Sequence, residues 1–146
     1  MKVTVIGLTL AALLAGGVVC LADNPNMGTW KLNEAKSKFS PGSGKNHTVV
    51  YEAAGDSVKV TVDGIDANGN PTHSEWTGKF DGKDYPVTGD PTSDSRAYKK
   101  VGDHTLAMTI KKGGKVTVTG SIVVAADGKS RKVTTSAMGT AVYDKQ

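Results

Sequence analysis

Apolar and polar residues alternate along most of the chain with a period of two. Val58, Val60 and Val62 alternate with polar neighbours, and the same pattern recurs over residues 106–110 and 116–124. Val and Thr are frequent in these runs, and both suit a pleated, half-buried surface. A period of two with one apolar face predicts β-strands that have one side on a core and the other in water.

Short turn signals separate these runs, because Asn-Gly, Asp-Gly and Gly-Gly pairs favour the positive φ angles of tight hairpins. Such short connections predict an all-β fold, an antiparallel up-and-down meander of about 8–10 strands. Open sheet edges invite aggregation, so we expect closure into a barrel, with a two-sheet sandwich as the alternative. The expected strands are 28–32, 47–53, 57–65, 71–80, 84–88, 94–101, 104–111, 115–125, 129–138 and 140–144.

One stretch departs from the alternating pattern. Residues 33–39 read Asn-Glu-Ala-Lys-Ser-Lys-Phe, which predicts a single helical turn with Asn33 as its N-cap. Residues 40–44, Ser-Pro-Gly-Ser-Gly, then predict a flexible loop. Two helices do not fit between the first two strands, so this loop either leaves the barrel mouth open or closes it alone.

The first predicted strand opens with Gly-Thr-Trp-Lys-Leu at residues 28–32. This stretch resembles the Gly-x-Trp opening of the calycins, the superfamily of lipocalins, fatty-acid-binding proteins and avidins. The resemblance implies a lipocalin-like barrel in which Trp30 plugs the floor. It also implies that Gly28 lets the backbone turn into the sheet, since glycine has no Cβ to clash.

The last predicted strand, Thr-Ala-Val-Tyr-Asp-Lys at 140–145, is similar to the closing strand of fatty-acid-binding proteins. In that family an Arg and a Tyr of this strand hold the carboxylate of the ligand. Tyr143 matches the family's Tyr, whereas Ala141 stands in place of the Arg. Lipocalins likewise pack an Arg of the last strand over the floor Trp, and this strand has none. The expected ligand is therefore mostly apolar, with little dependence on a carboxylate.

Residues 1–22 have the features of an export signal. Lys2 gives a positive start, residues 3–19 are apolar and uncharged, and small residues precede a change to polar sequence at Asp23. We expect cleavage after Ala22, which leaves residues 23–146 as one lipocalin-like domain in the periplasm or outside the cell, similar to small exported lipocalin-like bacterial proteins. A membrane anchor and lipidation at Cys20 are the alternatives. Removal of the signal would leave no membrane span and no cysteine for a disulfide.

Charge and composition argue against several classes of partner and site. The net charge of +4 is mild, the lysines are scattered and aromatic residues are only 5% of the chain, so no nucleic-acid interface is expected. The three histidines, His47, His73 and His104, are isolated in sequence, which predicts surface positions and no metal site. No cofactor motif and no nucleophile motif is present, so no catalysis is expected. A cluster of His73 or His104 with two acids would favour an enzyme.

The candidate ligand-binding residues are those that the alternation can place on an inner face or at the floor. Two of them are arginines, Arg96 and Arg131. Because most arginines in proteins are exposed to solvent, we expect both to lie on the outer, solvent-facing side of the sheet. An inward arginine would require an anionic ligand or a carboxylate partner. The candidates are Trp30, Tyr51, Trp76, Phe80, Arg96, Tyr98, Met108, Arg131 and Tyr143.

Three functions stand as hypotheses, and the third, an enzyme that uses the barrel mouth, is the one without a supporting motif. The first is an exported binding protein for a small apolar or amphipathic molecule held inside the barrel. The second is a filled barrel that acts as a protein-interaction or inhibitor module through its loops. A cavity next to Trp30 would favour the first function.

Overall fold

The computed structural model of the chain describes residues 24–146. The expected export signal at 1–22, the cleavage after Ala22 and the lipid site at Cys20 lie outside the described residues. Within the described part, no helix has the length and hydrophobicity needed to cross a membrane.

Ten strands account for most of residues 24–146, and no helix is present among them. The predicted all-β meander is therefore confirmed, and most strand bounds agree with the predicted ones to within a residue or two. The strands are β1 (Gly28–Phe39), β2 (Lys45–Ala54), β3 (Ser57–Ile65), β4 (Pro71–Gly78), β5 (Tyr85–Thr88), β6 (Ser95–Gly102), β7 (Thr105–Lys112), β8 (Lys115–Val124), β9 (Ser130–Thr135) and β10 (Gly139–Lys145).

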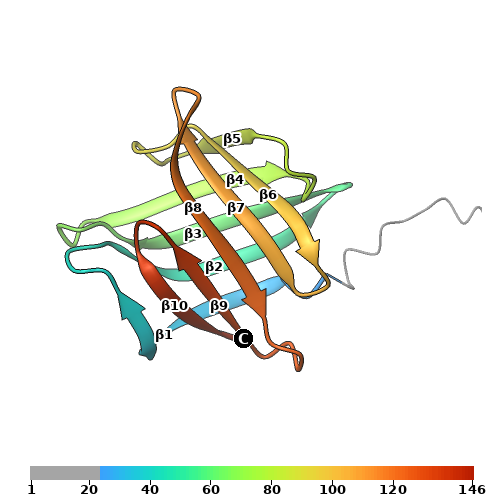
Figure 1. The fold of residues 1–146 in the computed structure, drawn as a ribbon, viewed down its shortest axis with the longest axis horizontal. Coiled ribbons are helices and arrows are strands. Elements are labelled where there is room, and N and C mark those ends of the chain that lie inside the picture. Colours follow the sequence, from blue (N-terminus) through green and yellow to red (C-terminus); the bar gives the residue numbers. More distant parts are fainter. Residues whose placement is uncertain (1–23) are drawn as a thin grey trace, which may run out of the picture.

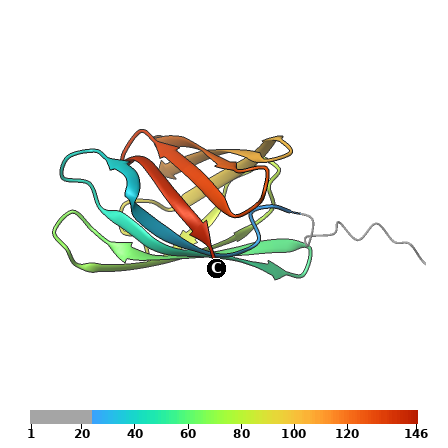
Figure 2. The same cartoon turned by 90° about the horizontal axis from the view of Figure 1, so that it is seen from below.

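The strands close into a barrel, as the need to cover the sheet edges predicted. Each strand pairs antiparallel with its neighbours in the chain, and β1 pairs with β10 to complete the ring, with Trp30 opposite Lys145. Figure 1 shows β1–β4 crossing β6–β9 at a steep angle. Figure 2 shows the same two groups as opposite layers of a flattened barrel. The sandwich alternative is thus replaced by a closed sheet.

The helical turn predicted for residues 33–39 is wrong, because this segment continues β1. Asn33 makes the side-chain contact of an N-cap, since its Oδ1 accepts a hydrogen bond from the Lys36 main-chain nitrogen. However, the main-chain nitrogen of Val142 donates to Ser37 Oγ at 2.9 Å and ties the segment to β10. The pairing shifts between Asn33 and Lys38, so residues 34–37 form a bulge rather than a helix. The predicted loop at 40–44 follows it.

The inner face of the barrel carries the core that the alternation predicted. Val58, Val60 and Val62 of β3 are all buried, and so are Leu106 and Met108 of β7. Their polar neighbours on the same strands point outward. The interior is lined by alternate residues of every long strand, which brings side chains far apart in sequence into one space.

Candidate functional site

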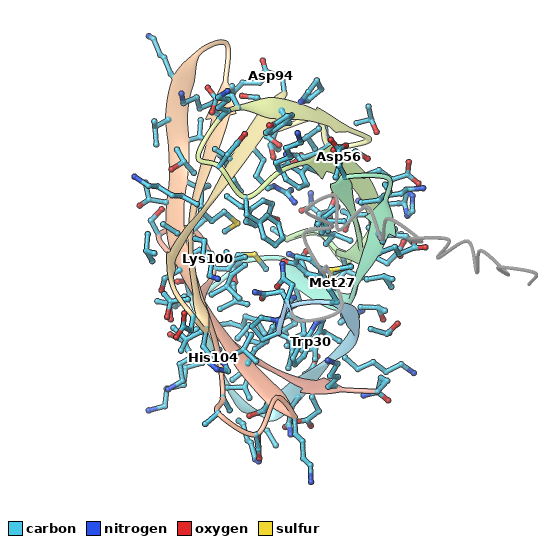
Figure 3. The ribbon with its side chains drawn as sticks, turned by 90° about the vertical axis from the view of Figure 1, so that its right-hand side faces the viewer. Met27, Trp30, Asp56, Asp94, Lys100 and His104 are labelled. Atoms are coloured by element: carbon cyan, nitrogen blue, oxygen red, sulfur yellow. The ribbon has the colours of Figure 1, made fainter. Side chains whose placement is uncertain are left out.

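Trp30 is buried near the start of β1, at the end of the barrel that we call the floor. Its side chain is 0% exposed, and its Nε1 donates a hydrogen bond of 2.8 Å to the carbonyl oxygen of Asn26. Met27, directly before β1, packs against the core near Trp30 (Figure 3). Gly28 has φ +111, a value that favours glycine and lets the chain turn into β1.

An arginine does pack over the floor tryptophan, and it comes from β9 instead of the last strand. The guanidinium carbon of Arg131 lies 4.9 Å from the Trp30 ring, 4.8 Å from the Tyr51 ring and 5.1 Å from the Tyr143 ring. Arg131 is directly opposite Tyr143 across the β9–β10 ladder, and diagonally across from Ala141 on the same inner face. The Arg–Tyr pair expected within one strand is therefore formed between two neighbouring strands.

A second group of aromatic side chains forms one wall of the interior. The Trp76 ring meets the edges of Tyr98 and Tyr85 at 4.8 and 5.6 Å, and it stacks on Phe80 at 6.3 Å. Gly78 leaves room for this arrangement, because a Cβ at that position would overlap the Tyr85 ring. Tyr51 joins this wall to the floor through edge contacts with Phe80 and Tyr98.

The expectation that both arginines lie on the wet face is wrong. Arg96 is 7% exposed and Arg131 is 3% exposed, and both are on inner faces. Arg96 Nη1 donates to the hydroxyl of Tyr98, two residues along β6, at 3.2 Å. The physical reason is the strand period: Arg96 shares a face with buried Tyr98, and Arg131 shares one with Val133, which packs against the core. The general tendency of arginines to lie on protein surfaces is therefore a weaker guide to their position than the strand face that they share with buried residues.

The buried cations act on the titration of the phenols around them. Burial raises the pKa of Tyr143 to about 12, and the charge of Arg131 opposes this rise. Burial and the neighbouring Tyr98 also raise the pKa of Tyr51, against the opposing charges of Arg131 and Arg96. Burial by itself would lower the pKa of Arg96, but Tyr98, Tyr51 and Asp90 outweigh it and raise the pKa. At neutral pH Tyr51 and Tyr143 are therefore neutral phenols, and Arg96 is charged.

A cavity of about 310 Å³ lies within the barrel, above the floor formed by Trp30 and Arg131. Its lining is mainly apolar and includes Val49, Ile110 and Val133. Loop residues at the barrel end opposite Trp30 also line it. Trp30, Trp76 and Phe80 do not line the cavity and instead support its floor and wall. The sequence candidates that do line it are Tyr51, Arg96, Tyr98, Met108, Arg131 and Tyr143.

Sequence reasoning missed the residues around the cavity mouth. Thr72, Asp90, Thr92 and Met138 line this end. Asp90 lies in the loop between β5 and β6, directly after Gly89, whose φ is +84. It caps this loop, because its Oδ1 accepts hydrogen bonds from the main-chain nitrogen and hydroxyl of Thr92. The same loop therefore forms part of the cavity rim.

His73 lies beside two acids on the outer face, which is the arrangement named above as favouring an enzyme. Its Nδ1 is 2.6 Å from Asp63 Oδ1 and its Nε2 is 3.4 Å from Glu75 Oε1. Hydrogen bonds to Asp63 and Glu75 raise the pKa of His73. All three side chains are exposed, and Lys59 adds a contact of 3.7 Å to Glu75. The cluster is therefore a surface ion-pair network on β3 and β4.

Among residues 24–146, no group of three His, Cys, Asp or Glu side chains is arranged to hold a metal ion. The cavity lining offers apolar walls, phenol hydroxyls and two guanidinium groups. Such a lining can hold an amphipathic molecule and orient its polar end.

No protein-family model matches the chain, and no curated protein is significantly similar to it. The closed antiparallel barrel of ten strands is consistent with a lipocalin-like fold. The resemblance thus rests on the barrel, the floor tryptophan and the arginine packed over it.

Proposed function

We propose that the barrel binds a small amphipathic molecule in its internal cavity. The observation that carries this proposal is the cavity of about 310 Å³, which falls in the size range of small-molecule sites, roughly 300–1,000 Å³. Its mainly apolar lining suits a hydrocarbon portion, and the polar groups at Arg96, Tyr98 and Arg131 suit a polar one. The proposal is for binding without a catalytic step.

The cavity also argues against the alternative of a filled barrel that acts through its loops. A filled interior would hold side chains in contact from wall to wall, because protein interiors are packed nearly as densely as organic crystals. The barrel instead holds a cavity of about 310 Å³, and Ala141 is among the residues that line it. This favours a ligand-binding function over a protein-interaction or inhibitor function.

Filling the cavity tests the proposal. Ala141 is buried on the inner face of β10 and lines the cavity, so Ala141→Phe places a ring in the ligand space. We expect it to weaken binding of an environment-sensitive fluorescent dye by at least tenfold, about 1.4 kcal/mol. Val142→Phe, on the outer face of the same strand, is the matched control and should keep wild-type affinity. Equal affinities of the two variants would contradict binding inside the barrel.

We also propose that the chain is exported and that its mature form begins at Asp23, without lipid. The support is the sequence of residues 1–22, with a positive start, an uncharged apolar run and small residues before the expected cleavage point. An intact-mass measurement of protein recovered from the periplasm or the medium should give the mass of residues 23–146. A mass that includes an acylated Cys20 would replace this proposal with a membrane-tethered form.

A further inference from the structure

The barrel interior contains two cations without a carboxylate in contact with either. No ion pair within 4.0 Å involves Arg96 or Arg131 in the described part of the chain. Guanidinium groups stay protonated in proteins, so burial cannot be relieved by loss of the proton. A buried charge needs a compensating partner, and the two arginines differ in what they have.

Arg131 is surrounded by aromatic rings. Trp30, Tyr51 and Tyr143 all lie within about 5 Å of its guanidinium carbon, which compensates a cation through the electron-rich ring faces. Its Nε and Nη1 are buried and have no hydrogen-bond partner among the described residues. The charge of Arg131 is therefore compensated by the aromatic rings around it, which also hold its side chain in place at the floor.

Arg96 has less compensation. Within residues 24–146, the Arg96 guanidinium makes one hydrogen bond, from Nη1 to the Tyr98 hydroxyl, and its Nε has no partner. The charge of Asp90, at the cavity mouth, contributes to the raised pKa of Arg96. That carboxylate is already bonded to Thr92 and Ser93 of its own loop. Arg96 therefore has no carboxylate in contact with it within residues 24–146, and its Nε is left without a hydrogen-bond partner there.

Tyr98 completes a site beside Arg96. Its hydroxyl accepts the hydrogen bond from Arg96 Nη1, which leaves the phenol proton free to donate to a further group. The Tyr98 ring is held against Trp76 and Phe80, at 4.8 and 5.7 Å. The Arg96 main chain is held as well, because Trp76 Nε1 donates to its carbonyl oxygen at 2.8 Å. A guanidinium and a phenol are thus fixed side by side in the cavity wall.

We infer that the cavity ligand carries a singly charged oxyanion, bound by Arg96 together with Tyr98 on β6. This inference rests on the proposed function and names its ligand class as an amphipathic acid. The guanidinium N–H groups and the phenol O–H donate to different oxygens of the anion, and charge-assisted hydrogen bonds of this kind are strong. The apolar lining near Met108, Ile110 and Ile122 takes the hydrocarbon part. The presence of inner cations also removes the premise for a ligand with little dependence on a carboxylate.

The test is displacement of the fluorescent dye by molecules of equal chain length at neutral pH: octanoate, octyl sulfate, octanol and octylamine. We expect octanoate to bind at least tenfold more tightly than octanol, with octylamine the weakest. Tighter binding of octyl sulfate than octanoate would identify a sulfate-type head group as the preferred oxyanion. Octanol that displaces the dye as well as octanoate does would overturn the inference and leave the proposed function intact. A barrel that binds neither the dye nor any of these molecules would overturn both.

Variants assign the acid preference to its residues. Arg96→Met should reduce the ratio of octanoate to octanol affinity at least tenfold, and Tyr98→Phe should reduce it about threefold. Lys99→Met, on the exposed outer face of β6, is the matched control and should leave the ratio unchanged. Arg131→Met should have a smaller effect than Arg96→Met, and an equal or larger effect would overturn the assignment to Arg96. Near-ultraviolet circular dichroism checks that each variant keeps its aromatic packing, and octanol binding gives a second check on the cavity.

Discussion

Replacement of Trp30 by Ala is expected to lower the free energy of unfolding by about 3–5 kcal/mol, the range for large aromatic deletions in a core. The Trp30 side chain is fully buried, it bonds the carbonyl of Asn26, and Arg131 lies on its ring. Its removal leaves a cavity at the floor and takes one of three aromatic rings from a buried cation. Denaturant melts of the two proteins measure the difference.

Two further variants show whether that loss comes from the floor. Trp30→Phe keeps a ring beneath Arg131 but loses the hydrogen bond to Asn26, so it should fall between the wild type and the Ala variant. Val123→Ala removes an exposed side chain of β8 and should stay within about 0.5 kcal/mol of the wild type. A loss below about 1 kcal/mol for Trp30→Ala is incompatible with a plug that holds the floor.

The second large effect is expected at Trp76, which connects the aromatic wall to Arg96. Trp76 is 1% exposed, and Trp76→Ala should lower the free energy of unfolding by about 3–5 kcal/mol. The same change removes the hydrogen bond to the Arg96 carbonyl and the ring that holds Tyr98. The preference for octanoate over octanol should therefore also fall. Melts and dye displacement measure the two effects on the same protein.

A positioning role for Trp76 can be separated from a purely structural one. Trp76→Phe keeps most of the packing but cannot donate to Arg96, so it should lose acid preference out of proportion to its loss of stability. Thr77→Ala, on the exposed side of β4, is the control for both measurements. If Trp76→Phe loses stability while the octanoate preference is unchanged, Trp76 supports the wall without positioning Arg96.

The alternation and the turn residues predicted the strands well, because each is a local property. The failure at residues 33–39 has a non-local cause: Ser37 is bonded to Val142, and no pattern within the segment contains that contact. A helix and a bulge both allow Asn33 Oδ1 to accept a hydrogen bond from the Lys36 main-chain nitrogen. The partner strand decides between them.

The candidate site was predictable in part. The inner face of β6 pairs Arg96 with Tyr98 by spacing alone, and this spacing was the better guide to the position of the arginine. The position of Arg131 over Trp30 depends on closure of the barrel, which sets two residues about 100 positions apart against each other. The cavity volume follows from how all the inner side chains fill the space, and this has no signature in a single strand.

The pairing of β1 with β10 gives the barrel a ring order in which its first and last strands adjoin. Gln146 donates its main-chain hydrogen bond to the carbonyl of Thr29 at 3.0 Å. All other strand pairings join consecutive segments, so the entropy of bringing distant residues together is concentrated at this one seam. Asn33 and Asp144, which bond across it, are 111 positions apart. A circular permutant opened at the turn between β7 and β8 would keep every ladder and move the slow, long-range step of folding to a different pair of strands.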